Sequence, residues 1–156
     1  MSTLPRSTPE SVGISSERLC AALGQLSRLD SLNSIMVLRH GNVCLEGWWQ
    51  PYAPHQPHML FSLSKSFVSA AIGIAVGEER LRVSDKLAGF FPEYRDCVTD
   101  ERMRDVTLHD LLSMTSGHAA CATSAMKGDP DQNCVRGFLS SGLTYAPGDH
   151  FCYNSA

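Results

Sequence analysis

The sequence predicts a mixed fold of the α/β (α+β) class, because its strand-like and helix-like patterns lie in separate stretches. One helical pattern covers residues 15–29, two β-rich runs fall within residues 34–49, and the later patterns are helical. Segregated strands and helices are typical of α+β domains. Only two strands are predicted, and a lone two-stranded hairpin is marginally stable in water. We therefore expect further strands to complete the sheet.

The first predicted helix begins after Ser15, whose side chain can accept hydrogen bonds from free backbone N–H groups. Glu17 lies in the first turn, where a negative charge is favourable. Leucines recur at helical spacing and predict one buried face: Leu19, Leu23, Leu26 and Leu29.

A β-hairpin is predicted next, because residues 34–39 and 43–49 are rich in apolar and β-branched side chains and are separated by His40, Gly41 and Asn42. Prolines then recur in the segment that leads to Ser62. They fix the backbone torsion φ and favour an extended loop: Pro51, Pro54 and Pro57.

Lys65 is the only charged residue in the apolar stretch 60–76, which predicts a buried helix beginning near Ser62. Positions i and i+3 share a helix face, so the Ser62 hydroxyl and the Lys65 amine would point into the same space. Burial disfavours a charged lysine, and we expect a lowered pKa that makes Lys65 a proton acceptor. At a helix N-terminus, the Ser62 amide could also help to hold an oxyanion. The pattern indicates an activated serine.

The same spacing occurs a second time, in Ser124 and Lys127. Gly128, Asp129 and Pro130 follow at once, and no apolar helix surrounds the pair. We predict that this second match is a loop, so spacing alone does not identify a catalytic pair.

Two further helices are predicted after residue 100. Thr107 and Asp110 have capping-box spacing, and Gly117 is the expected C-cap of the helix they begin. Asp129 and Pro130 are expected to begin another helix. The segment 147–149 then predicts a turn that leads to Tyr153.

Composition describes a globular protein, and 156 residues are enough for one domain. With 43% hydrophobic residues, 19% charged residues and a net charge of −3, neither disorder nor nucleic-acid binding is expected. The apolar stretch 67–76 is too short to span a membrane. Since residues 1–10 are polar and proline-rich, we expect a cytoplasmic protein with no membrane partner. The oligomeric state is left open.

No metal site or other cofactor is expected. The six cysteines form no CxxC pair. His55 and His58 have HxxH spacing, but they lie in the proline-rich loop with no nearby glutamate. The remaining downstream histidines are interpreted as surface or capping residues: His109, His118 and His150.

Several segments, taken in order, resemble the serine β-lactamase and penicillin-binding-protein family. They are similar to its class C β-lactamase, esterase and 6-aminohexanoate-oligomer hydrolase branch. The matching segments are 61–67 (FSLSKSF), 81–85, 91–92, 107–117 (TLHDLLSMTSG), 145–148 (YAPG) and 151–153 (FCY). This resemblance implies a β-lactamase/transpeptidase-like fold and runs from about Thr8 to the end of the chain.

The resemblance also implies roles for three residues. Ser62 would be the nucleophile, Lys65 a proton acceptor or electrostatic partner, and Tyr153 a general acid/base. A phenol with an ordinary pKa of about 10 acts as a base when a nearby cation stabilises its phenolate, and Lys65 could supply that cation. Whether Lys65 or Tyr153 takes the first proton is left open.

The sequence departs from the family pattern in two places. The family's YxN motif is here Tyr153, Asn154 and Ser155, so Ser155 stands where a substrate-binding asparagine is usual. The family's third motif and its later strands do not occur in the sequence. We expect residues 8–156 to be the N-terminal part of one β-lactamase-like serine hydrolase domain, and residues 1–7 to be a polar tail. On its own, this piece is expected to be inactive or poorly folded.

The implied function is hydrolysis of a small-molecule ester, amide or lactam through an acyl-enzyme. Two alternatives remain open. One is a penicillin-binding or sensor-type relative that is acylated without turnover. The other is an inert truncated homologue that keeps the motifs without the chemistry.

Overall fold

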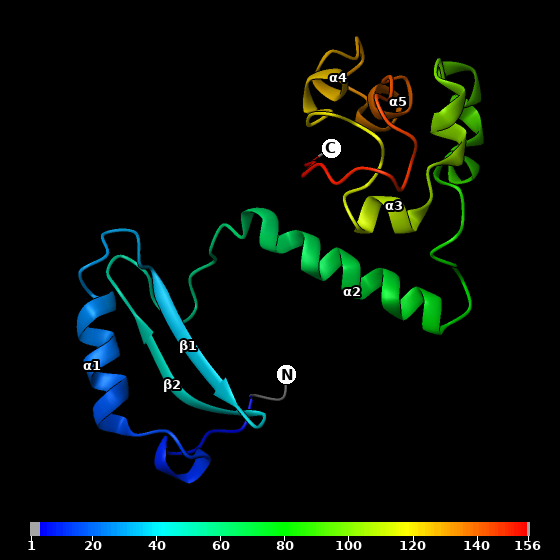
Figure 1. The fold of residues 1–156 in the computed structure, drawn as a ribbon. Coiled ribbons are helices and arrows are strands. Elements are labelled where there is room, and N and C mark those ends of the chain that lie inside the picture. Colours follow the sequence, from blue (N-terminus) through cyan, green and yellow to red (C-terminus); the bar gives the residue numbers. More distant parts are fainter. Residues whose placement is uncertain (1–3, 156) are drawn as a thin grey trace. The chain divides into compact units, whose positions relative to one another are not determined.

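Strands and helices occupy different parts of the chain, which confirms the predicted α+β class. The computed structural model describes residues 4–155 and divides into unit 1, Met1–Met59, and unit 2, Leu60–Ala156 (Figure 1). The elements of unit 1 are η1 (Glu10–Val12), α1 (Ser16–Leu26), β1 (Ser34–Arg39) and β2 (Asn42–Trp48). Those of unit 2 are η2 (Phe61–Leu63), α2 (Ser64–Gly77), η3 (Leu87–Phe90), η4 (Pro92–Cys97), η5 (Glu101–Asp105), α3 (Leu108–Leu112), α4 (Thr123–Lys127) and α5 (Cys134–Leu139).

The first helix forms as predicted, with Ser15 as its N-cap. The Ser15 hydroxyl accepts a hydrogen bond from the backbone N–H of Arg18 at 3.3 Å. The helix ends at Leu26, so the last leucine of the predicted stripe, Leu29, lies beyond it and is exposed.

The predicted hairpin is also present, with β1 and β2 antiparallel. His40 and Gly41 connect them with φ values of 50° and 77°. A two-residue turn with positive φ at both positions matches the right-handed twist of the paired strands. Among residues 4–155 these are the only strands that form a sheet. Val43 of β2 also pairs with the described end of the predicted tail, through Pro5 and Ser7; residues 1–3 lie outside the described part.

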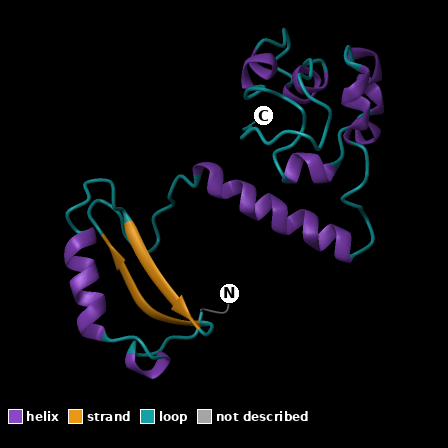
Figure 2. Ribbon diagram, in the orientation of Figure 1, coloured by secondary structure: helices purple, strands orange, loops and turns teal. Residues whose placement is uncertain are grey.

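The hydrophobic core of unit 2 gathers where η4, η5, α4 and α5 meet. Its buried members are Val98, Met103, Val106, Ala122, Phe138, Leu139 and Leu143. Figure 2 shows that the helices around this core, unlike α2, are short and are joined by loops. Several core residues lie in the loops that flank these helices, among them Val106, Ala122 and Leu143. Their burial holds the loops in defined positions.

Helix α2 forms where it was predicted, but the expectation that it is buried was wrong. None of its residues is buried, and Phe67 and Ile74 are 63% and 64% exposed. A helix that is apolar on all sides is buried only where other elements cover it, and the described elements leave much of α2 uncovered. No helix in the range 4–155 is long and apolar enough to cross a membrane.

Three local predictions in unit 2 need correction. Ser124 and Lys127 do not lie in a loop but in the short helix α4. Gly117 does not cap α3, which ends at Leu112 with Ser113 as its C-cap. Helix α5 is capped by Asn133 rather than opened by Asp129. Gly117 and Asp129 were expected at helix ends, but the helices end or begin several residues away from them.

Gly117 is instead required by a close backbone contact. Its φ is +95°, and a Cβ at this position would lie 2.6 Å from the carbonyl oxygen of Tyr145. Both the positive φ and the contact exclude larger residues. The glycine therefore fixes the path of the chain between α3 and α4.

Candidate active site

The segment that carries Ser62 is a single turn of 3-10 helix, η2, that runs directly into α2. Phe61, immediately before the serine, has a φ of 46° and a side chain that is 77% exposed. A positive φ is strained for a bulky residue. The strain lies next to Ser62, whose side chain is exposed at the start of a long helix.

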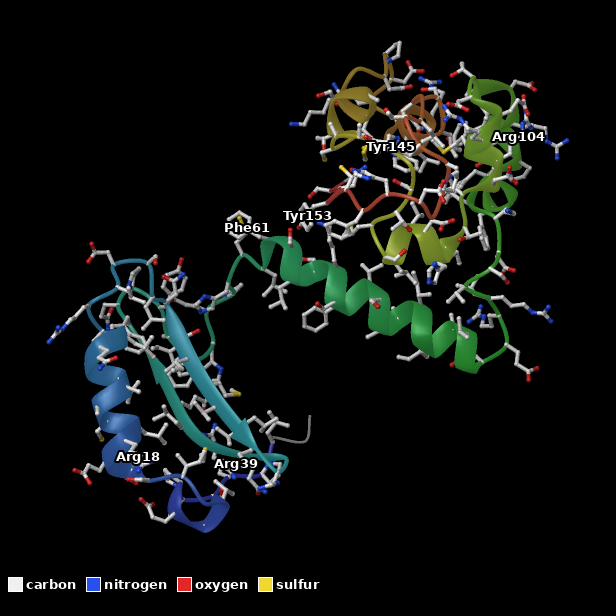
Figure 3. All side chains as sticks on the ribbon, viewed as in Figure 1. Arg18, Arg39, Phe61, Arg104, Tyr145 and Tyr153 are labelled. Atoms are coloured by element: carbon white, nitrogen blue, oxygen red, sulfur yellow. The ribbon has the colours of Figure 1, made fainter. Side chains whose placement is uncertain are left out.

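Three side chains from two distant parts of the sequence meet at the Ser62 hydroxyl. The Tyr153 Oη lies 2.5 Å from the Ser62 Oγ, and the Lys65 Nζ lies 3.3 Å from the same oxygen. Lys65 Nζ is also 5.4 Å from the centre of the Tyr153 ring. Figure 3 shows Tyr153 near Phe61, at the N-terminal end of α2. The structure thus brings together all three residues that the sequence nominated as catalytic.

Ser155 joins the same group through Lys65. The Lys65 Nζ donates to the Ser155 Oγ at 3.3 Å, so the lysine amine links two hydroxyls. The sequence suggested Ser155 as a substrate-binding residue; in the structure its described side-chain partner is Lys65.

The surroundings of Tyr153 favour its ionised form. The Ser62 hydroxyl makes the largest contribution to a lowered pKa of Tyr153, and the Ser155 hydroxyl and the positive charge of Lys65 add to it. Each of these groups stabilises a phenolate, by a hydrogen bond or by charge. A tyrosine held in this way can accept the Ser62 proton, which leaves a nucleophilic oxygen beside a cation.

Lys65 differs from the expectation in its environment. It is half-buried and lies among hydroxyl groups, not inside an apolar core. The burial that was to make the lysine a base is therefore not present. Of the two roles that the sequence left open, this position favours that of a cation which stabilises negative charge on its neighbours.

The 152–155 segment is held in place by the residue between Tyr153 and Ser155. Asn154 is buried, and its Oδ1 accepts a hydrogen bond from the Ala122 N–H at 3.2 Å. Its own backbone N–H points to the Met114 sulfur at 3.5 Å. Successive side chains of an extended chain alternate in direction. Asn154 therefore anchors the segment while its two neighbours reach Lys65 and Ser62.

The 114–118 loop supports the same segment through backbone hydrogen bonds. The Met114 carbonyl accepts from the Cys152 N–H at 2.9 Å, and the Thr115 carbonyl accepts from the Gly148 N–H at 2.8 Å. The Gly117 carbonyl accepts from the N–H groups of Thr144 and Tyr145. The 114–118 loop thus has a structural function: Met114 holds the residue before Tyr153, and Thr115 and Gly117 hold the 144–148 turn that leads to it.

A cavity of about 300 Å³ opens next to Lys65, between α2 and α3. Four of its lining residues are polar: Ser64, Lys65, Ser69 and Asn154. The others are apolar: Val68, Ile72, Leu108, Leu111, Leu112 and Met114. Its volume is at the lower end of the range usual for ligand sites. Of the side chains that meet at Ser62, Lys65 also lines this cavity, so the cavity adjoins the candidate site.

No group of three potential metal ligands occurs among residues 4–155. His58 stacks on the Tyr52 ring at 4.3 Å, and His150 stacks on Tyr145 at 4.2 Å. Residues of the Ser62 group are hydroxyls and an amine, which do not form a metal-binding set. The chemistry available at this site is that of acid, base and nucleophile.

Sequence reasoning missed two features of the site. No role was predicted for Asn154, although alternation along an extended segment would have placed it opposite Tyr153 and Ser155. His118 was interpreted as a surface or capping residue, but it is buried at 5% exposure. Nothing in the sequence around His118 signals its partner Ser141, because the contact joins residues that are far apart in the chain.

Comparison with known proteins places the chain beside a known family and a known fold. A family model described as beta-lactamase matches residues 33–156. A solved structure of a Bacillus anthracis protein, named for a presumed 6-aminohexanoate-dimer hydrolase activity, superposes with a TM-score of 0.69 at 17% sequence identity. The alignment covers 99% of this chain and 45% of that one. No protein with a curated description matches the sequence.

Proposed function

The chain belongs to the beta-lactamase family, and on that premise we propose that it carries the nucleophile of a serine hydrolase that acts through an acyl-enzyme. The observation that supports this most strongly is the contact of Tyr153 with Ser62 at 2.5 Å, with Lys65 at 3.3 Å from the same hydroxyl. This is the arrangement expected of an activated serine, with the base and a cation both within reach.

In the proposed reaction the Ser62 Oγ attacks the substrate carbonyl carbon, while its proton passes to the Tyr153 oxygen. A new C–O bond forms, and the carbonyl π electrons move to oxygen to give a tetrahedral intermediate. When the intermediate collapses, the bond to the leaving nitrogen or oxygen breaks, and the leaving group takes the proton from Tyr153. In the second half of the reaction a water oxygen attacks the acyl carbon while Tyr153 takes a proton from the water, and a second tetrahedral intermediate forms. The bond between the acyl carbon and the Ser62 oxygen then breaks, the Ser62 oxygen takes the proton from Tyr153, and the acid product leaves.

Lys65 is proposed to act as the cation of the site. Its charge stabilises the phenolate of Tyr153 before attack, and Ser155 keeps the amine in place by accepting a hydrogen bond from it. This assigns proton transfer to Tyr153 and electrostatic stabilisation to Lys65. The SxxK spacing matters because it brings the amine to within 3.3 Å of the nucleophile.

The proposed substrate is a small-molecule ester, amide or lactam. The structurally similar Bacillus anthracis protein is named for hydrolysis of a 6-aminohexanoate dimer, and such a dimer is joined by an amide bond. The present chain spans 45% of the length of that protein. We therefore also propose that residues 8–156 form the N-terminal part of one such domain, with the remaining substrate contacts made by other residues of the full-length protein.

Covalent labelling tests this proposal. The full-length natural protein and its Ser62→Ala variant are treated with a fluorophosphonate, and separately with a β-lactam and an activated ester, and intact mass is followed with time. We expect the natural protein to gain one adduct at Ser62, with release of the ester or lactam acyl group over time. Stable adducts from the substrates would instead indicate a sensor-type protein, and the absence of any Ser62 adduct would overturn the proposed nucleophile.

A further inference from the structure

His118, directly after the TSG segment, makes a hydrogen bond at each ring nitrogen. Its Nδ1 lies 2.9 Å from the Ser116 Oγ, and its Nε2 lies 2.8 Å from the Ser141 Oγ. The ring also packs against Phe138, with centres 5.1 Å apart. Both His118 and Ser116 are buried, at 5% exposure each. The histidine therefore links the 114–118 loop to the C-terminal end of α5.

The hydrogen bonds identify the tautomer of this histidine. The Ser141 hydroxyl has one hydrogen, and it donates that hydrogen to the Phe138 carbonyl at 2.6 Å. Its oxygen must then accept from His118, so Nε2 carries the proton. Nδ1 is left as an acceptor and takes the hydrogen of the Ser116 hydroxyl. With a neutral ring, each polar atom of Ser116, His118 and Ser141 in this chain of contacts has a hydrogen-bond partner.

The electrostatics agree with a neutral ring. Burial lowers the pKa of His118, and no charged group contributes to that change. The groups that contact the ring from the loop and from α5 are two hydroxyls and an aromatic side chain. Neither Ser62 nor Lys65 is among them. His118 is thus not placed to exchange protons with the reacting groups.

The loop that His118 holds is the one that supports Tyr153. Met114 accepts from the N–H of Cys152, the residue before Tyr153, and Thr115 accepts from the N–H of Gly148. If the loop loses its link to α5, the carbonyl groups of Met114 and Thr115 are no longer held in position to accept these backbone hydrogen bonds. The Tyr153 oxygen must stay within hydrogen-bond reach of Ser62 to act, and displacements of about 1 Å can cost on the order of a hundredfold in rate.

We propose that His118 is a positioning residue, which holds the 114–118 loop against α5 and thereby keeps Tyr153 in contact with Ser62. The catalytic consequence rests on the proposed function of Ser62. The structural consequence does not, because it concerns the hydrogen bonds of Cys152 and Gly148.

Three variants of the full-length protein test this role. His118→Leu removes both hydrogen bonds and puts an apolar side chain of similar size against Phe138. His118→Asn keeps an amide oxygen that can accept from Ser116, but its shorter side chain does not extend to the Nε2 position that bonds Ser141. It serves as a partial rescue. Asn133→Ala is the matched control, because it removes the N-cap of the same helix α5 without touching the 114–118 loop. Each protein is first checked by circular dichroism for native folding.

Two measurements are then made on each variant. The first is amide hydrogen exchange at Cys152 and Gly148, and the second is the single-turnover rate of Ser62 acylation. For His118→Leu we expect exchange at these amides to rise at least tenfold and acylation to slow by roughly ten- to hundredfold, with little change in KM. His118→Asn should fall between this variant and the natural protein. Asn133→Ala should lower the melting temperature but leave both measurements near their natural values.

The outcomes separate this inference from the proposed function. Unchanged exchange at Cys152 and Gly148 in His118→Leu would overturn the positioning role, whatever the activity. Equal losses in His118→Leu and Asn133→Ala would reduce His118 to a general contributor to stability and would also overturn it. If Ser62 is never acylated in the natural protein, the proposed function fails, and the exchange data alone decide the role of His118. A ¹⁵N spectrum of the natural protein should show His118 as the neutral Nε2–H tautomer, and the other tautomer would contradict the hydrogen-bond assignment.

Discussion

Two segments of this chain have the same Ser-x-x-Lys spacing and both are helical, yet only one meets other polar side chains. Ser62 and Lys65 contact each other and are joined by Tyr153 and Ser155. Ser124 and Lys127 lie in α4, where both are exposed, and no side-chain hydrogen bond between them is found within residues 4–155. The difference lies in what the rest of the fold brings to each pair.

The comparison shows that Ser-x-x-Lys spacing in a helical segment does not by itself bring the two side chains into hydrogen-bond contact. Activation needs a base and a cation that hold their positions. At Ser62 the Tyr153 hydroxyl, which is the proposed base, comes from a segment 91 positions away in the sequence, and that segment is fixed by the 114–118 loop and by Asn154. Within residues 4–155 no hydrogen bond from a distant side chain reaches Ser124. Substitutions that remove the distant partners should therefore make the first pair behave like the second.

The largest effect in this comparison is expected from Tyr153→Phe, which removes the oxygen at 2.5 Å from Ser62 and leaves the ring. Loss of a general base typically costs about 10²- to 10⁴-fold in rate, and we expect a fall of that size in kcat/KM. Tyr145→Phe is the control, because the described side-chain contact of Tyr145 is ring stacking on His150, which phenylalanine keeps.

The pH profile provides a second readout for Tyr153. Its lowered pKa means that activity should rise with pH through a value below the ordinary tyrosine pKa of about 10, since the base form is the phenolate. This limb should be absent from the residual activity of Tyr153→Phe. An identical profile in both proteins would show that another group is the base.

A loss of roughly a hundredfold is expected from Lys65→Met, which keeps the apolar stem and removes the cation. The matched change in the second segment, Lys127→Met, should leave the rate unchanged. Steady-state kinetics on an activated ester measures both. In Lys65→Met the pKa of Tyr153 should also move upward, toward its ordinary value, because a positive charge that lowers it is gone. Near-natural activity of Lys65→Met would refute the electrostatic role.

A smaller effect, about five- to tenfold in kcat, is expected from Ser155→Ala. This change removes one hydrogen bond to the Lys65 amine and one group that lowers the pKa of Tyr153. If Ser155 binds substrate instead, KM should rise while kcat stays constant. The ratio of the two changes therefore distinguishes the contact found in the structure from the role suggested by the motif.

The smallest effect concerns the stability of the region beside the second segment. Two hydrogen bonds from the Arg136 guanidinium, with smaller contributions from backbone N–H groups, lower the pKa of Asp129 to about 2. The unfolded chain takes up a proton near pH 4, before the folded protein does, so this stabilisation is complete above about pH 4 and is lost toward pH 2. Urea unfolding should show Asp129→Asn to be less stable at pH 7, with the difference shrinking as the pH falls. A constant difference across this range would contradict the assignment.

Much of the chain could be predicted from local chemistry. Three features that depend on a few neighbouring residues formed as predicted. They are the helix cap at Ser15, the hairpin turn at His40 and Gly41, and the capping box of Thr107 with Asp110. The order of motifs nominated Ser62, Lys65 and Tyr153, and the structure brings these three together.

What could not be predicted depends on contacts between distant residues. The exposure of α2 depends on which elements cover it, and an apolar pattern does not contain that information. Ser155 meets Lys65, and His118 meets Ser141, across gaps of 90 and 23 positions. The helical state of Ser124 and Lys127 was missed for a similar reason, because α4 is short and packs on α5 and the core of unit 2.

The most direct test of the central claim is to let the two serines compete for one reagent. The full-length protein is treated with a limiting amount of fluorophosphonate, and the adduct is located by peptide mass spectrometry in the natural protein and in Tyr153→Phe. The account predicts that Ser62 alone is labelled in the natural protein, and that labelling of Ser62 in Tyr153→Phe falls toward the background level of Ser124. Equal labelling of Ser62 and Ser124, or full labelling of Ser62 without the Tyr153 hydroxyl, would contradict it.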